Sequence, residues 1–402
     1  MPPPGPKSRY VRHEKSLPRH NNPSSAQSII KAPFVPAAPK ERPGWKGIGF
    51  QKPKKKQPPR VVPKSEKEPP LQFDCEVATQ QKLVNVARQT FPQVVDRDYE
   101  ELKPVLAKVR EAMEDAEGEE QILNLWNEKE DRLAYIARWS PIRALILAAL
   151  LQEVLDSSKD KTEEKTGSEV LNVLAIGGNT TDLLGWAAYA HLKVEGFSAN
   201  LSLVDAAPWT TEIGDLEKGL RSPPQLSKYA SAAARAAAVP FISPGSLKAT
   251  YQQRNVLSPW AEEELKSMLG QGASIITLSF VLKDLQRQSL AQTIAFFISL
   301  TAAAPNGSLL LIVDEPDVEV AAGEKEKRYP LRFFLDLALL GRGVTSGESN
   351  DDSDAEEERQ KKDKWEGMDD KCGKRVFEPA EGLKYPLGIG KVGVQVHLFR
   401  RR

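Results

Sequence analysis

The stretch V-L-A-I-G-G-N-T-T, Val173–Thr181, decides the fold of this chain. It closes an apolar run, Val170–Ile176, which has the length of a buried strand, and two glycines follow directly. Glycines at the end of a strand let the backbone pass close to a ligand where a side chain would clash. A helix is predicted next, over Leu183–Val194. The pattern is typical of the first unit of a doubly wound sheet.

A second apolar run, Asn200–Val204, ends in an acidic residue. The carboxylate of Asp205 stands 28 positions after Gly177, at the tip of this strand. A carboxylate in that place can accept hydrogen bonds from both hydroxyls of a ribose. The two features together therefore indicate a site for a ligand that contains a nucleoside.

Strands and helices continue to alternate along the chain. Helices are predicted over Ala230–Ala238 and Ser289–Ala303, and strands over Ser274–Phe280 and Leu309–Val313. A short extended stretch is expected near Val256, and the alternating run Val392–Arg401 predicts a last strand. Strands separated by helices favour an α/β, Rossmann-like sheet with helices on both faces.

A helical block precedes the sheet. From Leu71 to Asp156, apolar residues recur at spacings of three and four. Pro104 is expected in the first turn of one helix, and Ser140 and Pro141 are expected to cap and begin another. We expect this block to pack on the sheet.

The first 70 residues differ from the rest in composition. They hold sixteen Lys or Arg, four Glu and sixteen of the chain's thirty prolines, although the whole chain has a net charge of only +1. Such a segment cannot bury enough apolar surface to offset the entropy of ordering. We therefore predict a disordered basic tail (1–70), a helical block (71–156) and a Rossmann-like domain (169–402) with a disordered acidic insertion at about 343–364.

Several classes of protein are disfavoured by composition. Two cysteines, Cys75 and Cys372, and four scattered histidines do not make a disulfide framework or a zinc site, so we expect no metal. The start is proline-rich and charged, unlike a signal peptide. The longest apolar runs, Ile142–Leu151 and Ala291–Ala304, are shorter than the roughly twenty residues of a membrane span, so we expect no membrane partner.

The cofactor follows from what the glycine motif lacks. A nicotinamide cofactor calls for G-x-G-x-x-G, and Asp182 stands at the third glycine position. Since no pyrophosphate loop is present, the motif favours S-adenosylmethionine, a ligand without phosphate. The residues predicted to bind it follow the strand ends: Gly177, Gly178, Asn179, Asp205, Ala206, Asn255, Val256 and Ser279.

Several longer motifs carry a family resemblance. They are Y-I-A-R-W-S-P-I-R-A-L at Tyr135–Leu145, T-L-S-F-V-L-K-D-L at Thr277–Leu285, R-Y-P-L-R-F-F-L-D at Arg328–Asp336, L-K-Y-P-L at Leu383–Leu387, and the ending H-L-F-R-R. From about Leu71 onward the chain resembles the fungal 25S ribosomal RNA uridine-N3 methyltransferases, which have a Rossmann-like fold. The element R-W-S-P-x-R-A-L is the most specific part of the resemblance.

The resemblance implies an S-adenosylmethionine-dependent enzyme that methylates uridine N3 in large-subunit ribosomal RNA. Because N3 carries a proton that is engaged in base pairing, the target must be unpaired or flipped out and must lose that proton. Asp284 is the predicted base. Asn255 stands where the family tends to have an acid, and Lys283-Asp284 where it tends to have Asn-Glu. These departures leave open a non-catalytic ribosome-assembly protein with a degenerate methyltransferase fold.

RNA contacts are predicted in two places. The run K-P-K-K-K contributes Lys52, Lys54, Lys55 and Lys56, which could bind phosphates, direct the protein to the nucleus, or belong to a solvated linker. Arg138 and Arg143, with Trp139, could form a lid over the cofactor, contact RNA, or act as a packing anchor between the helical block and the sheet. We expect a monomer that acts on ribosomal RNA or the pre-ribosome in the nucleus, chiefly the nucleolus, with the cytoplasm as an alternative.

Trp209 and the pair Asp314 and Glu315 each allow two interpretations. Trp209 could stack near an adenine or belong to the core, and the core is favoured. Asp314 and Glu315 end a predicted strand and could face the substrate, although acidic residues at strand ends are more often solvated.

Overall fold

The computed structural model describes residues 70–116, 118–156, 170–193, 197–322, 327–340, 364–368, 370 and 372–402. The predicted basic tail and acidic insertion fall almost entirely outside these residues.

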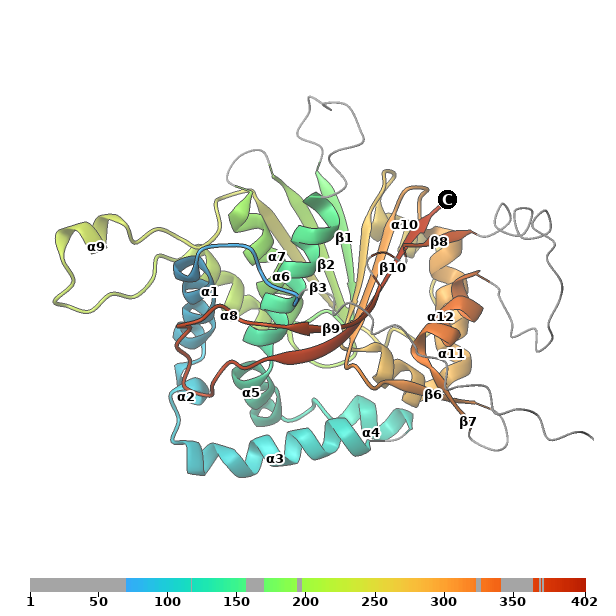
Figure 1. Cartoon of the computed structure of the whole chain (residues 1–402), viewed down its shortest axis with the longest axis horizontal. Helices are drawn as coiled ribbons and strands as arrows, with labels where there is room; N and C mark the ends of the chain where they lie inside the picture. The colour runs from blue at the N-terminus through green and yellow to red at the C-terminus, as the bar shows by residue number, and fades with distance from the viewer. Residues whose placement is uncertain are drawn as a thin grey trace, which may run out of the picture. The chain divides into compact units, whose positions relative to one another are not determined.

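A central sheet of eight strands organises the structure (Figure 1). The strand order is β3-β2-β1-β4-β5-β10-β8, and β9 pairs with β10. The first five strands in that order are parallel, whereas β10 runs antiparallel to β5, β8 and β9. This confirms the predicted α/β class. The strands are β1 (Leu171–Ile176), β2 (Ala199–Asp205), β3 (Leu247–Gln253), β4 (Ile275–Ser279), β5 (Leu309–Asp314), β8 (Trp365–Gly367), β9 (Gly373–Phe377) and β10 (Val392–Arg401).

Both faces of the sheet are covered by helices, which explains why the central strands β1, β4 and β5 are mostly apolar. In β1, Val173 and Ala175 belong to one hydrophobic core, and Leu174 and Ile176 to another on the opposite face. The first core includes α1 (Val77–Thr90), α5 (Lys129–Arg138), α6 (Ser140–Asp156), α7 (Thr180–Leu192) and α8 (Thr210–Arg221). The second includes α10 (Glu262–Leu269), α11 (Leu282–Ala303) and α12 (Leu331–Leu340).

The N-terminal helices pack on the sheet, as expected, and share its first core. They also include α2 (Pro92–Val95), α3 (Tyr99–Asp115) and α4 (Glu119–Asn124). A buried ion pair of 3.0 Å between Arg132 and Glu212 joins α5 to α8. No single described helix has the length and apolar composition to cross a membrane, although α5 and α6, bent by 53°, meet that test as a pair.

Two corrections concern how helices begin. The Asp98 side chain accepts the N–H of Glu100, so α3 begins at Tyr99 and Pro104 lies inside the helix instead of in its first turn. The hydroxyl of Ser140, predicted to cap α6, lies 2.9 Å from that of Thr180. It therefore joins α6 to α7.

Three further elements differ from their predicted positions. The third strand ends at Gln253, and Val256 lies beyond it in a loop, where it is buried. The alanine-rich helix is shorter than predicted, as α9 (Ala232–Ala236). The hairpin of β6 (Glu319–Ala322) and β7 (Lys327–Pro330) had no recognised signal in the sequence.

The helix predicted from Ser289 begins earlier, at Leu282. Ser289 has a non-helical backbone (φ −167°, ψ 109°), and its hydroxyl accepts the N–H of Gln292. The residue therefore does begin a helical segment, but another segment precedes it and carries Lys283 and Asp284.

Candidate active site

A pocket lies where β1, β2 and β4 end, the edge at which doubly wound sheets bind ligands. Five of the residues predicted to bind the cofactor line it: Gly177, Asp205, Ala206, Asn255 and Val256. Asp284, the predicted base, lines the same pocket. The structure thus brings together residues that are more than a hundred positions apart in the sequence.

The left-handed backbone conformation at position 177 favours glycine. The φ of Gly177 is +67°, and a Cβ added there would lie 2.4 Å from Cγ2 of Val281. The expectation that a side chain would meet the ligand is therefore corrected, because it would first meet Val281. Val281, in the segment after β4, therefore lies directly against Gly177, in the loop after β1.

Two acidic groups in this pocket have raised pKa values. Burial raises the pKa of Asp205 to about 7, although one of its oxygens accepts the N–H of Ala207 at 2.7 Å. Burial, followed by the charge of Asp314, raises the pKa of Asp284 to about 7. Removal from water disfavours the charged form of a carboxyl group, so both groups change charge near neutral pH.

The affinity for S-adenosylmethionine is expected to fall as the pH is lowered from 8 to 6. An ionised Asp205 can only accept hydrogen bonds, whereas the protonated group that prevails below its pKa of about 7 is a weaker ribose acceptor. A requirement for the ionised form lowers affinity by up to about tenfold per pH unit below the pKa. Calorimetry at pH 6 and 8 measures this. Asp205→Asn should reduce the pH dependence, and equal affinities for the wild type at both pH values would contradict the assignment.

Three predicted cofactor residues lie elsewhere. Asn179 caps α7, where its side chain accepts the N–H of Thr181 at 2.8 Å, and the Asp182 carboxylate accepts the N–H of Asn179 in return. A Cβ on Gly178 would meet Ala175 and Leu203 in the core. Ser279 is buried beside Asp182. The pattern N-x-x-D is a capping box, so this part of the motif supports the helix start.

Helix α4 forms a roof over the pocket, which the sequence did not indicate. Ile122, Leu123 and Trp126 line the pocket from this side. The Asn255 amide donates to Glu119 of α4 at 3.3 Å. The free volume is about 50 Å³, enough for one or two water molecules. A nucleoside is larger than this volume, so the walls of the pocket must move apart to admit one.

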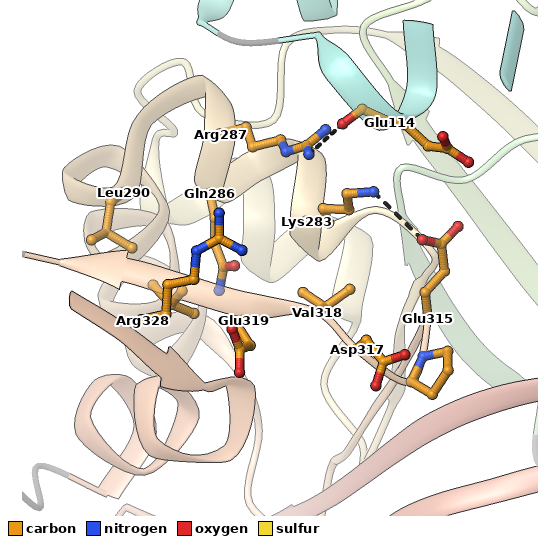
Figure 2. A pocket seen from close by; sticks show the side chains of 12 residues that line it. Glu114, Lys283, Gln286, Arg287, Leu290, Glu315, Asp317, Val318, Glu319 and Arg328 are labelled. Atoms are coloured by element: carbon orange, nitrogen blue, oxygen red, sulfur yellow. Dashed lines mark hydrogen bonds and ion pairs between the residues drawn. The ribbon is translucent and has the colours of Figure 1, made fainter. Parts of the chain in front are cut away.

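A larger cavity of about 630 Å³ lies beside this pocket (Figure 2). Its walls are α11, the segment after β5 and the β6–β7 hairpin (Figure 2). It falls within the range of about 300–1,000 Å³ typical of small-molecule sites. Its lining is mostly polar: Glu114, Lys283, Gln286, Arg287, Leu290, Glu315, Pro316, Asp317, Val318, Glu319, Val320 and Arg328.

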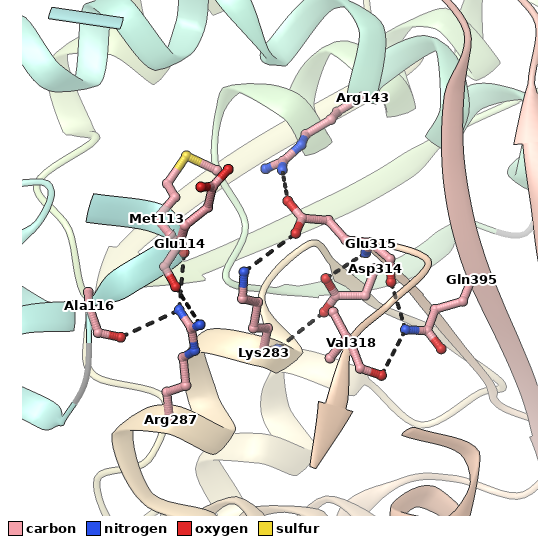
Figure 3. A network of polar contacts seen from close by, with 10 residues as sticks. All are labelled: Met113, Glu114, Ala116, Arg143, Lys283, Arg287, Asp314, Glu315, Val318 and Gln395. Atoms are coloured by element: carbon pink, nitrogen blue, oxygen red, sulfur yellow. Dashed lines mark hydrogen bonds and ion pairs between the residues drawn. The ribbon is translucent and has the colours of Figure 1, made fainter. Parts of the chain in front are cut away.

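A polar network joins α6, α11 and the end of β5 (Figure 3). Asp314 is only 2% exposed, which corrects the expectation that it is solvated. Burial raises its pKa to about 6. Arg143 is also buried, with its guanidinium 4.2 Å from the centre of the Phe280 ring and 3.3 Å from Glu315. Its predicted role as an RNA contact is therefore corrected, because a buried and partnered arginine is not available to surface phosphates.

Trp209, Arg138 and the tail lysines differ in their surroundings. Trp209 is buried in the core beside Trp126 and Tyr135, as favoured. Arg138 is partly exposed at the end of α5, and its RNA contact stays a prediction. The tail lysines, Lys52 to Lys56, lie outside the described residues. Within the described part of the chain, no group of three or more His, Cys, Asp or Glu is arranged to hold a metal ion.

The family described as "Putative SAM-dependent methyltransferase" matches residues 87–400, which include all of the sheet except its last residue and all residues that line the two cavities. The chain belongs to this family. It is an S-adenosylmethionine-dependent methyltransferase, and S-adenosylmethionine is its cofactor.

A curated relative of this methyltransferase is the 25S rRNA (uridine(2843)-N(3))-methyltransferase of Saccharomyces cerevisiae. The two are 24% identical over 290 residues, which cover 66% of this chain and 74% of the yeast protein. Among solved structures, the N-methyltransferase NodS from Bradyrhizobium japonicum with S-adenosyl-L-homocysteine is 11% identical and covers 74% of this methyltransferase and 98% of NodS, with a TM-score of 0.32.

Proposed function

We propose that this methyltransferase modifies N3 of a uridine in large-subunit ribosomal RNA. The match to the yeast enzyme is the observation that carries the proposal, because that enzyme's name specifies this atom and this RNA. The motifs around Arg138 and Lys283 resemble the same family. A cavity large enough for a nucleoside beside the cofactor pocket is compatible with a base that has left its helix.

The pocket residues fit the cofactor chemically. S-adenosylmethionine, when bound, supplies a methyl group on a sulfonium sulfur. Asp205 would accept hydrogen bonds from the ribose hydroxyls, because its carboxyl group lines the pocket at the end of β2. The glycine backbone at Gly177 and the loop at Asn255 would flank the rest of the ligand. Trp126, which follows α4, would exclude water above it.

The tail is proposed to supply RNA affinity and nuclear or nucleolar targeting. Residues 1–70 have an excess of positive charge, whereas the remaining residues hold 40 Lys or Arg against 51 Asp or Glu. An acidic catalytic domain would be poorly attracted to RNA on its own. A lysine-rich arm contacts phosphates and not base edges, so the tail would not select the methylated base.

Removal of residues 1–66 is expected to weaken RNA binding and to flatten its salt dependence, with cofactor affinity unchanged. Each lost phosphate contact on single-stranded RNA should lower the slope of log affinity against log salt by about 0.7. The test is a salt titration with full-length and truncated protein, and calorimetry with S-adenosylmethionine serves as the control. Identical slopes would place the RNA contacts on the folded domain.

The proposal is tested by incubating the purified protein with S-adenosylmethionine and ribosomal RNA from cells that lack the gene. Nucleoside mass spectrometry should then detect new 3-methyluridine. Methylation of another position on the base would refute the N3 assignment. A protein that binds ribosomal RNA but not S-adenosylmethionine would instead be a non-catalytic assembly factor.

A further inference from the structure

The larger cavity presents a carboxylate between two cations. Oε1 of Glu315 accepts a hydrogen bond from the Arg143 guanidinium at 3.3 Å, and Oε2 lies 3.5 Å from Nζ of Lys283. The Glu315 side chain is 44% exposed, whereas that of Arg143 is 7% exposed. Arg143 is therefore buried behind the cavity wall, whereas Glu315 and Lys283 line the cavity (Figure 2).

Two buried side chains hold this arrangement in place. Asp314 accepts the backbone N–H of Lys283 at 3.2 Å through one oxygen and that of Glu315 at 2.8 Å through the other. The Gln395 amide donates to the backbone carbonyl of Glu315 at 2.6 Å. Burying such groups costs free energy, so a cluster that fixes two cavity-facing side chains is a candidate for function.

The same helix segment separates the cavity from the cofactor pocket. Lys283, Gln286 and Arg287 of α11 line the cavity. Asp284, Leu285 and Gln288 line the cofactor pocket. Neighbouring residues of a helix point to different sides, so this segment forms a shared wall. A ligand in the cavity would therefore lie beside the cofactor.

The hydrogen-bonding groups of the cavity also complement the edge of a uracil ring, which presents a carbonyl, the N3–H and a second carbonyl. Lys283 can donate to a carbonyl oxygen, and Glu315 can accept from N3–H. Nε2 of Gln286 is a further donor on this wall, buried and with no hydrogen-bond partner among the described residues. A cation near either carbonyl stabilises the negative charge that forms when N3 loses its proton.

We propose that this cavity binds the uracil ring of the acceptor nucleotide, with Glu315 accepting the N3 proton and Lys283 donating to a carbonyl oxygen. This inference rests on the proposed function. The N3–H bond breaks, its proton moves to the Glu315 carboxylate and the electron pair stays on N3. N3 then forms a bond to the methyl carbon as the carbon–sulfur bond breaks, with that pair remaining on sulfur. Glu315 thus replaces Asp284, which lines the cofactor pocket, as the base.

The test is Glu315→Gln in the full-length protein, assayed for 3-methyluridine on ribosomal RNA from cells that lack the gene. The rate should fall by about 10²–10⁴-fold, the usual contribution of a positioned base. Calorimetry should show unchanged affinity for S-adenosylmethionine. The residual rate should keep rising with pH, because N3 then ionises without help from the protein.

Three further variants act as controls. Asp215→Asn removes an exposed carboxylate of α8 that pairs with Lys218 and lines neither cavity, so its rate should stay within a few-fold of wild type. Glu315→Asp should keep the wild-type pH profile at a lower rate. Asp284→Asn should change cofactor affinity and leave the shape of the pH profile intact.

A wild-type rate in Glu315→Gln would overturn the inference. So would a loss of rate with the wild-type pH profile, since it would show that Glu315 only braces the loop. The inference would also fall if Asp284→Asn showed the rising residual rate instead. If the wild-type protein itself formed no 3-methyluridine on this RNA, the proposed function would have failed, whatever the variants did.

Discussion

Asp205→Ala is expected to lower the affinity for S-adenosylmethionine by about 10²–10⁴-fold. The substitution removes two charge-assisted hydrogen bonds to the ribose, each worth about 1.5–3 kcal/mol. The fold should survive, because the raised pKa of Asp205 shows that its charge is unfavourable in the folded protein. A folded-state pKa above the usual value means that stability is lost as the pH rises through it, so at pH 8 the ionised Asp205 lowers stability and its removal should not destabilise the fold.

Calorimetry measures the affinity of the Asp205→Ala variant, and thermal unfolding measures its stability. Asp205→Asn is the matched control, because the amide keeps one oxygen acceptor and should bind with intermediate affinity. Unchanged affinity in the alanine variant would remove Asp205 from the cofactor site.

Gly177→Val is expected to destabilise the protein by about 2–6 kcal/mol. A non-glycine residue in a left-handed conformation costs roughly 1–3 kcal/mol, and overpacking against a neighbour costs a further 1–3 kcal/mol or so. Both apply, because φ is +67° and the new Cβ would lie 2.4 Å from Val281. Urea denaturation measures the change in the free energy of unfolding.

Gly214→Ala is the control for that measurement. Gly214 lies in α8, and a Cβ there would have no neighbour within 4 Å, so alanine should leave stability unchanged or raise it by up to about 1 kcal/mol. If Gly177→Val kept its stability and lost only cofactor binding, Val281 would have moved aside, and the glycine would serve ligand access alone.

The fold could be predicted where burial leaves a clear pattern. Strands β1, β4 and β5 are covered on both faces and appear as continuous apolar runs. Strand β3 has a neighbouring strand on one side only and is half exposed, so L-K-A-T-Y-Q-Q lacks that signal, whereas the nearby apolar Val256, which is buried in a loop, gives a false one. The start of α11 was missed because Ser289 gives a second, internal start signal.

Site residues could be predicted from the sequence only where they lie at the ends of sheet strands. Asp205 and Gly177 end strands, and parallel strand ends meet at one edge regardless of the rest of the chain. The roof from α4 and the burial of Arg143 and Asp314 depend on helix packing, which residue spacing does not encode. The sequence does not show whether a given acidic or basic residue is solvated or buried, so only the structure revealed this network.

The most direct test of the account is mass-spectrometric mapping of 3-methyluridine in large-subunit ribosomal RNA from cells that lack the gene. The deletion strain is complemented with the wild-type gene or with the Asp205→Ala variant. The comparison shows whether methylation requires cofactor binding by the protein or only its presence. We predict that one 3-methyluridine is lost on deletion, restored by the wild type and not restored by Asp205→Ala. Retention of every 3-methyluridine in the deletion strain would contradict the proposed function.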